Sequence, residues 1–399
     1  MRGSRRRILG VSANVFFLGM VSFLTDASSE MLFTLLPLFL LNVLGTPVAI
    51  IGLIEGVGEA TATSLRLVSG WLSDRLGRRK GLTAAGYTLS TVAKPFLYLA
   101  GSWGMVLGVR FADRLGKAIR TAPRDALLVD SSTPQEWGRS FGLHRALDSY
   151  GAVVGLGIAA LVVYLSQRGA VALAGDTFRS LVLISIVPAA IAVLMLLLFV
   201  TEPAPHTPLH VSAGAAPITL RFKLFLGIMV VFTLGRLADA FLVLRAHDLG
   251  LSTLHILLLF ILFNLVYANL AVVTGRLSDR VGRLRVLALG WGSFGLIYLG
   301  LAAAQAPWQV MALIVLYGVS YGSTEGVGRA LVADMVGRQR RGTAYGLYHG
   351  VVGFAALPGG LLAGYLWQAV NPAAPFLMAA ALMGLATLAL VALLREPAA

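Results

Sequence analysis

The sequence has no cysteine in 399 residues, which excludes disulfides, iron–sulfur clusters, thiolate metal sites and cysteine nucleophiles. It also has no G-x-x-x-x-G-K-[ST] segment, so the chain carries no P-loop with which to hydrolyse ATP. His206 and His210 stand four residues apart, but no third ligand is near, and a solvated segment accounts for them. Without a nucleophile–base motif or a soluble domain, we expect neither an enzyme nor a bound metal or cofactor.

Charged residues are scarce, at 13% of the chain against about 25% in soluble domains. Apolar residues reach 57% against about 45–50%, which is typical of a polytopic membrane protein. Acidic residues are fewer than basic ones, 18 against 32, and the net charge is +14. A membrane protein places such a surplus in loops beside anionic lipid. Because the chain has no basic soluble domain, we expect the bilayer and not nucleic acid as its partner.

Twelve segments are apolar enough to cross the hydrocarbon core as helices, which needs about 20 residues each. They lie at 10–41, 48–69, 81–100, 103–126, 140–165, 178–200, 221–244, 253–274, 286–304, 307–332, 343–369 and 373–394. With the N-terminus inside the cell, the basic clusters fall in cytoplasmic loops, and the opposite loops hold only Arg168, Arg179 and Arg245. We therefore predict a multi-pass protein of a bacterial-type cytoplasmic (inner) membrane with both termini in the cytoplasm.

The chain repeats itself at a nearly constant offset. Residues 70–78, GWLSDRLGR, recur as GRLSDRVGR at 275–283, and GRSFGL at 138–143 recurs as GTAYGL at 342–347. The longest polar connection, 201–220, separates the sixth segment from the seventh and is rich in Pro, His and Ser.

This repeat predicts an all-α membrane protein with 12 transmembrane helices in two pseudo-symmetric six-helix bundles. The bundles would be residues 1–200 and 221–399, joined by a cytoplasmic linker at 201–220. An even number of helices per half gives both bundles the same orientation. A central cavity is then expected at their interface near the midplane.

The segment at 70–80 resembles a signature of the major facilitator superfamily (MFS) of transporters, G-x-L-x-D-R-x-G-R-[RK], between the second and third helices. The copy at 275–283 is nearly as complete. The resemblance covers essentially the whole chain and implies a transporter of the MFS fold. It also implies that the loop aspartate pairs with basic residues and caps a helix of the other half, which latches the outward-facing state. The latch residues would be Gly70, Asp74, Arg75, Gly77, Arg78, Asp279 and Arg280.

Two further patterns resemble those of the drug:proton antiporters. Their fourth helix carries R-x-x-Q-G-x-G-x-A, of which this chain keeps Arg110, Gly116 and Ala118. Their fifth helix carries a glycine pattern, of which it keeps Gly142, Gly151 and Gly155. The chain departs from these patterns at Asp113, Arg114 and Leu156. This resemblance implies proton-coupled export.

Ionisable residues inside the spans are functional candidates, because a charge at the bilayer centre costs about 2.5–3.5 kcal/mol. Asp26 and Glu30 lie four residues apart, on one face of the first helix and at or beyond the midplane. Burial and a nearby like charge both favour a carboxyl that keeps its proton, so either residue is a candidate proton carrier. Arg110 would be the coupling partner that favours the ionised form. Asp113 and Arg114 could take part in the same proton coupling, or bind a charged group of the substrate. A structural ion-pair network is the alternative.

Other polar residues in the spans are candidates for the substrate cavity or for a gate. The predicted cavity residues are Glu55, Glu59, Arg114, Arg236, Asp239, Tyr317, Tyr321 and Glu325. Packing is the alternative for the tyrosines. Arg145 and Asp148 lie three residues apart on the fifth helix, where we predict a cytoplasmic gate pair. Helix-end snorkelling is the alternative for the basic residues of such a gate.

These observations predict a proton-coupled secondary active transporter that moves a small organic molecule by alternating access, with export as the direction. It would act as a monomer and would use the proton gradient as its only energy source. The alternative is a proton symporter that takes up an anionic metabolite. The basic stripe Arg110, Arg114 and Lys117 motivates it, because such a stripe could hold a carboxylate or phosphate.

Overall fold

The apolar segments are helical, because lipid offers no water to satisfy backbone N–H and C=O groups and a helix satisfies them internally. The computed structural model describes residues 7–8, 10–76, 79–133, 136–167, 170–202, 219–336 and 341–394. These residues form α1 (Ala13–Phe33), α2 (Leu36–Leu38), the π-helical turn η1 (Phe39–Val43), α3 (Val48–Leu76), α4 (Arg79–Ala93), the 3₁₀ turn η2 (Lys94–Leu97), α5 (Trp103–Asp130), α6 (Trp137–Gln167), α7 (Gly175–Phe199), α8 (Leu220–Gly235), α9 (Asp239–Asp248), α10 (Thr253–Val281), α11 (Arg283–Ala303), α12 (Pro307–Met335), α13 (Arg341–Ala369) and α14 (Ala374–Leu393).

Each predicted span coincides with one helix or with consecutive helical pieces, which confirms an all-α membrane fold. In the described part of the chain, nine helical segments are long and apolar enough to cross a bilayer by length and composition alone. The remaining spans are α4 with η2, α5 and α12. The α5 helix is the most highly charged of the three, and it supplies most of the candidate site described below.

The seventh span, predicted over 221–244, consists of two helical pieces separated by a break. α8 ends at Gly235, and α9 begins only at Asp239. A break inside the membrane leaves backbone groups without helical partners, and these need other acceptors. Here the N–H of Arg236 donates to Thr233 O at 3.2 Å, and the N–H of Leu237 donates to the Tyr298 hydroxyl at 3.3 Å. A side chain from α11 thus stabilises the interruption.

The described residues divide into two compact units. Unit 1 comprises residues 1–44 and 65–209, and unit 2 comprises residues 45–64 and 210–399. The helix α3 therefore begins in unit 2 and ends in unit 1. The predicted boundary at 201–220 stays a prediction, since most of that segment lies outside the described residues.

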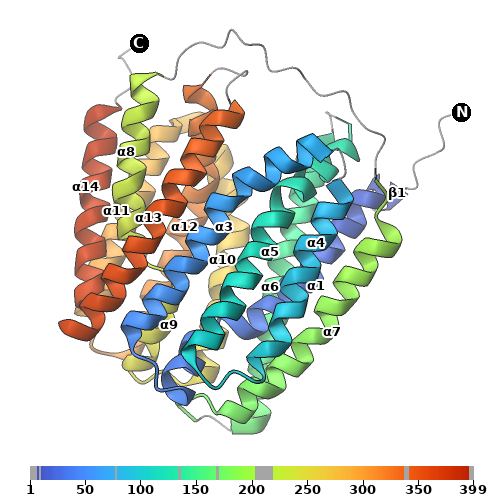
Figure 1. The fold of residues 1–399 in the computed structure, drawn as a ribbon. Helices are drawn as coiled ribbons and strands as arrows, with labels where there is room; N and C mark the ends of the chain where they lie inside the picture. The colour runs from blue at the N-terminus through green and yellow to red at the C-terminus, as the bar shows by residue number, and fades with distance from the viewer. Residues whose placement is uncertain are drawn as a thin grey trace, which may run out of the picture. The chain divides into compact units, whose positions relative to one another are not determined.

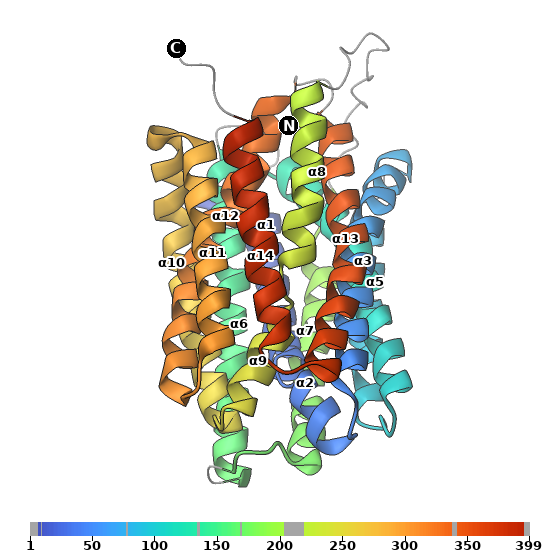
Figure 2. The ribbon, with the colours of Figure 1, turned by 90° about the vertical axis from the view of Figure 1, so that its left-hand side faces the viewer.

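The repeat seen in the sequence recurs in the packing inside each unit. In unit 1, α1 packs against α6 and α7, and α4 packs against α5 and α7 (Figure 1). In unit 2, α8 packs against α13 and α14, and α11 packs against α12 and α14 (Figure 2). Helices at corresponding positions in the two halves therefore pack against corresponding neighbours.

An equivalent Arg–Asp ion pair joins two neighbouring helices in each half of the repeat. Arg79 Nη1 at the start of α4 pairs with Asp130 at the end of α5. Arg283 Nη1 at the start of α11 pairs with Asp334 Oδ2 on α12 at 2.6 Å. In unit 1, the backbone N–H groups of Arg79 and Lys80 also donate to the carboxylate of Glu202, each at 2.8 Å. A carboxylate is favourable there because it accepts from the open N–H groups at a helix N-terminus.

A short antiparallel hairpin, β1 (Arg7–Ile8) and β2 (Val11–Ser12), precedes α1 and contacts the loop before α6. Arg7 Nη2 lies 2.6 Å from Glu136 Oε1. Glu136 Oε2 accepts from the Thr133 N–H at 3.3 Å and from the Thr133 hydroxyl at 3.1 Å. These contacts, with the Thr133 backbone hydrogen bond first, hold the pKa of Glu136 below its ordinary value of 4.5.

The lowered pKa of Glu136 predicts that acid loosens this hairpin. A group with a lower pKa in the folded state stabilises the fold above its unfolded-state pKa, and the contribution disappears as the pH falls through the folded-state value. We expect amide exchange in the hairpin, corrected for intrinsic rates, to rise on acidification and to be high at every pH in Glu136→Gln. Asp176→Asn, an exposed acid at the start of α7, is the control. Equal protection in wild type and Glu136→Gln at neutral pH would contradict this prediction.

Candidate functional site

A pair of carboxyl groups from α1 and α6 lies at the centre of the polar residues of unit 1. The side chains of Asp26 and Asp148 lie within hydrogen-bonding reach of each other, and we call them the carboxyl pair. The Ser22 hydroxyl, one turn before Asp26 on α1, donates to Asp148 Oδ1 at 2.6 Å. Arg145 Nη1 lies 3.9 Å from Asp148 Oδ2. The two aspartates were predicted to serve a proton site and a gate separately, and the structure brings them together.

Basic residues of α5 surround the carboxyl pair. Arg124 donates through Nη2 to Asp125 Oδ1 at 2.9 Å, and its Nη1 lies 3.5 Å from the Ser22 hydroxyl. Lys117, two turns earlier on α5, is exposed and acts electrostatically on Asp26. Arg124 and Lys117 therefore supply positive charge to both members of the pair.

Two more arginines of α5 stack on an aromatic ring of α1. Arg110 Cζ lies 4.3 Å from the centroid of the Phe33 ring, and Arg114 Cζ lies 6.0 Å from it. Such cation–π contacts hold a guanidinium in place without neutralising its charge. Arg110 is buried, and Arg114 is half-buried. Glu30, the other predicted proton carrier, accepts a hydrogen bond from the Thr34 hydroxyl at 2.9 Å.

A second buried network joins α1, η2 and α7. Lys94 is fully buried, and its Nζ donates to the hydroxyls of Ser28 at 2.7 Å and of Ser29 at 3.0 Å. Ser28 in turn donates to Ser185 O at 2.7 Å. Asp113 is buried and acts electrostatically on Lys94. The only sign of this network in the sequence is Lys94, a charged residue directly before Pro95 within an apolar span.

The α4–α5 contact fixes another buried cation. Arg120 Nη1 donates to the Ser90 hydroxyl at 2.7 Å, and its Cζ lies 4.5 Å from the centroid of the Tyr87 ring. A Cβ added at Gly116 would lie 2.5 Å from Ser90 Oγ and 2.6 Å from Gly86 O. The two helices therefore touch at backbone distance, and Arg120 packs inside the unit instead of extending to its surface.

Unit 2 places an arginine beside tyrosines at the break between α8 and α9. Arg236 Nη2 donates to the Tyr321 hydroxyl at 2.7 Å, and Arg236 Cζ lies 4.8 Å from the centroid of that ring. Tyr317 is fully buried and lies against Phe263, Phe294, Tyr298 and Tyr321. Asp239 is exposed in the first turn of α9. The packing interpretation thus fits Tyr317, whereas Arg236 and Tyr321 form a polar pair.

The remaining predicted site residues are dispersed. Glu55 is half-buried on α3, and the exposed Glu59 accepts from the Thr63 hydroxyl at 3.1 Å. Of the predicted latch residues, Gly70 is half-buried, Arg75 stacks over Trp71 at 5.3 Å and Arg280 is exposed. Five other predicted site residues lie, wholly or by their side chains, outside the described part of the chain: Asp74, Gly77, Arg78, Asp279 and Glu325. Among the described residues, no group of three His, Asp or Glu side chains is arranged to hold a metal ion.

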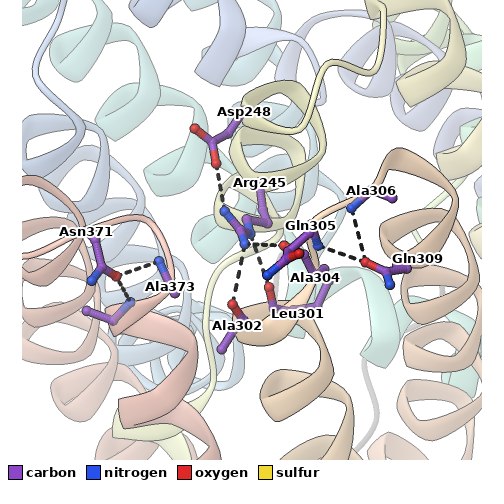
Figure 3. A network of polar contacts seen from close by, with 11 residues as sticks. Arg245, Asp248, Leu301, Ala302, Ala304, Gln305, Ala306, Gln309, Asn371 and Ala373 are labelled. Carbon is purple, nitrogen blue, oxygen red and sulfur yellow. Dashed lines mark hydrogen bonds and ion pairs between the residues drawn. The ribbon is translucent and has the colours of Figure 1, made fainter.

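A polar network in unit 2 is structural (Figure 3). Arg245 donates to the carbonyls of Leu301 at 3.1 Å and Ala304 at 2.8 Å, and it pairs with Asp248 at 2.7 Å. The carbonyls at a helix C-terminus lack helical donors, and a cation there satisfies them. Arg245, predicted only as an external loop residue, therefore caps the end of α11.

The whole chain resembles known transporters. The Major Facilitator Superfamily model matches residues 18–235 and 224–399. An MFS-type transporter of Methanocaldococcus jannaschii is 34% identical over 374 residues, which are 92% of this chain and 91% of that protein. The class E tetracycline resistance protein of Escherichia coli is 30% identical over 135 residues, 34% of this chain and 33% of that protein. The crystal structure of a mutant of the nucleoside transporter NupG superposes with a TM-score of 0.80 at 14% identity, over 96% of this chain and 100% of that chain.

The NupG likeness supports the fold alone, because its sequence identity is low. The family match over nearly the full length and the M. jannaschii relative carry the assignment. The predicted family and the absence of an enzymatic role are thereby confirmed. This chain belongs to the Major Facilitator Superfamily and is a membrane transporter.

Proposed function

We propose that this protein is a proton-coupled secondary active transporter that moves a small organic molecule by alternating access. The observation that carries the proposal is the carboxyl pair Asp26–Asp148, set inside membrane-spanning helices among basic residues. Ionisable groups are costly in a bilayer, and those retained there mark proton or substrate pathways. A carboxyl that gains and loses a proton during the cycle would couple transport to the proton gradient.

Export is the direction we propose, with both termini in the cytoplasm and the protein acting as a monomer in a cytoplasmic membrane. The similarity of about one third of the chain to a tetracycline resistance protein supports export, as do the matches to drug:proton antiporter patterns. The location of most basic clusters at one set of loops supports the orientation.

Uptake of an anion with protons is the second candidate, and the basic face of α5 favours it. Arg110 and Arg114 share the Phe33 ring, and Lys117 continues that face. The sign of the cargo decides the coupling. An anion bound near a carboxyl favours protonation of that carboxyl, so both enter together as in symport, whereas a cation competes with the proton as in antiport.

The external pH of weakly buffered proteoliposomes tests the proposal, while lipophilic cations, organic anions and sugars are added in turn. We expect external acidification specific to a transported compound, because antiport releases protons as the compound enters. Alkalinisation would replace export with proton symport. Protein-free liposomes are the control. Compound fluxes that do not change when a pH gradient is imposed would exclude proton coupling.

A further inference from the structure

The helices that bear the carboxyl pair touch at backbone distance at two points close to it. A Cβ added at Gly151 would lie 2.2 Å from Phe23 O, and one added at Gly155 would lie 2.2 Å from Ala27 O. Asp26 lies between these two contact points on α1, and Asp148 precedes Gly151 by one turn on α6. Small residues permit this close approach. Gly151 and Gly155 thus hold α1 and α6 close together next to the carboxyl pair.

A direct hydrogen bond between two carboxyl groups requires a proton on one of them, because ionised carboxylates only accept. Asp148 has the donors expected of the ionised partner. Its Oδ1 accepts from the Ser22 hydroxyl at 2.6 Å, and its Oδ2 faces Arg145 at 3.9 Å. A hydrogen bond within the pair would then come from Asp26 in its acid form.

The neighbours of the pair come from four elements and are mainly cationic. They are Glu30 from α1, Lys94 from η2, Lys117, Arg124 and Asp125 from α5, and His144 and Arg145 from α6. The helix α7 also packs against α1, but its only ionisable residues, Asp176 and Arg179, stand in its first turns. The nearby cations compensate the single negative charge of a pair that holds one proton.

We propose that Asp26 and Asp148 together form a site for a single proton, donated by Asp26 to Asp148, and that this site, and not Glu30, carries the coupled proton. The claim that this site carries the coupled proton rests on the proposed function, whereas the claim that the two carboxyl groups share a proton does not. Loss of the proton would leave two carboxylates in contact between helices that pack at backbone distance. Lys117 or Arg124 would then turn towards Asp26, which changes the contacts of α5 with α1 and α6.

Infrared difference spectroscopy of the purified protein tests the shared proton without any transport measurement. We expect wild type to show the carbonyl band of a protonated carboxylic acid, shifted in heavy water, and Asp26→Asn to lose it. Asp148→Asn should shift or remove the same band, because the acceptor of the proton has changed. Ser22→Ala, which removes one donor to Asp148, should shift it. Glu30→Gln is the matched control one turn away and should leave the band in place.

The outcomes separate the two proposals. A band that survives Asp26→Asn and Asp148→Asn, or disappears in Glu30→Gln, overturns the shared proton. If the band behaves as expected but proton-driven flux persists in a folded Asp26→Asn protein, the coupling role of the pair is overturned. The expected result is loss of proton-driven flux in Asp26→Asn with substrate counterflow retained. Should Asp26→Asn not fold, the Asp148→Asn and Ser22→Ala spectra decide instead.

Discussion

Replacing Gly155 by valine is expected to lower the free energy of unfolding by about 3 kcal/mol or more, the upper range for overpacking. The added Cβ would lie 2.2 Å from Ala27 O and 2.8 Å from Ala27 Cα. Both are backbone atoms of α1, so no side chain can rotate out of the way. α1 and α6 would have to separate, and the carboxyl pair would separate with them. A lower melting temperature in detergent and less monodisperse protein would report the change.

Gly157→Val is the matched control for this prediction. Gly157 lies on the same helix, and a Cβ added there meets no other atom within 4 Å. The loss of glycine and the gain of a β-branched residue are the same in both variants. We expect a change below about 0.5 kcal/mol at Gly157, as for surface substitutions. Equal losses in the two variants would show that valine in the helix, and not the contact with α1, is responsible.

Replacing Arg245 by alanine is expected to destabilise unit 2 by about 2–4 kcal/mol, since hydrogen bonds to charged groups contribute about 1.5–3 kcal/mol. Arg245 is only 7% exposed, and its guanidinium donates to three carbonyls around the end of α11, those of Leu301, Ala302 and Ala304. Alanine would leave these acceptors without a donor. Arg245→Lys should recover only part of the loss, because an ammonium lacks the planar fork. Thermal unfolding in detergent measures all three proteins.

Arg179→Ala provides the comparison for Arg245→Ala. Arg179 pairs with Asp176 at 3.3 Å and the same three-residue spacing, but its side chain is 45% exposed and that of Asp176 is 98% exposed. Exposed pairs contribute about 0–1 kcal/mol. The prediction fails if the two alanine variants lose similar stability, because the loss would then be a general effect of removing an arginine.

The fold was predictable because its signals are local. The lengths of the apolar runs predict the spans, and the repeated loop at 70–78 and 275–283 predicts two related halves. The packing partners of α4 and α11 correspond, as the repeat implies. The break at 236–238 was not predictable from hydropathy, since a tyrosine 61 positions further along the chain stabilises it.

Hydropathy and the internal repeat are enough to predict that this chain spans a membrane many times, that its halves are related, and which spans hold ionisable residues. How those residues pair depends on the packing of helices that are distant in sequence. Asp148 has Arg145 three residues away in sequence, yet it accepts a 2.6 Å hydrogen bond from Ser22 of another helix, and Asp26 lies beside it there. Spacing places a residue on a face of its own helix. Its partner depends on the rotation and closeness of neighbouring helices, which glycines such as Gly151 and Gly155 determine through contacts between distant segments.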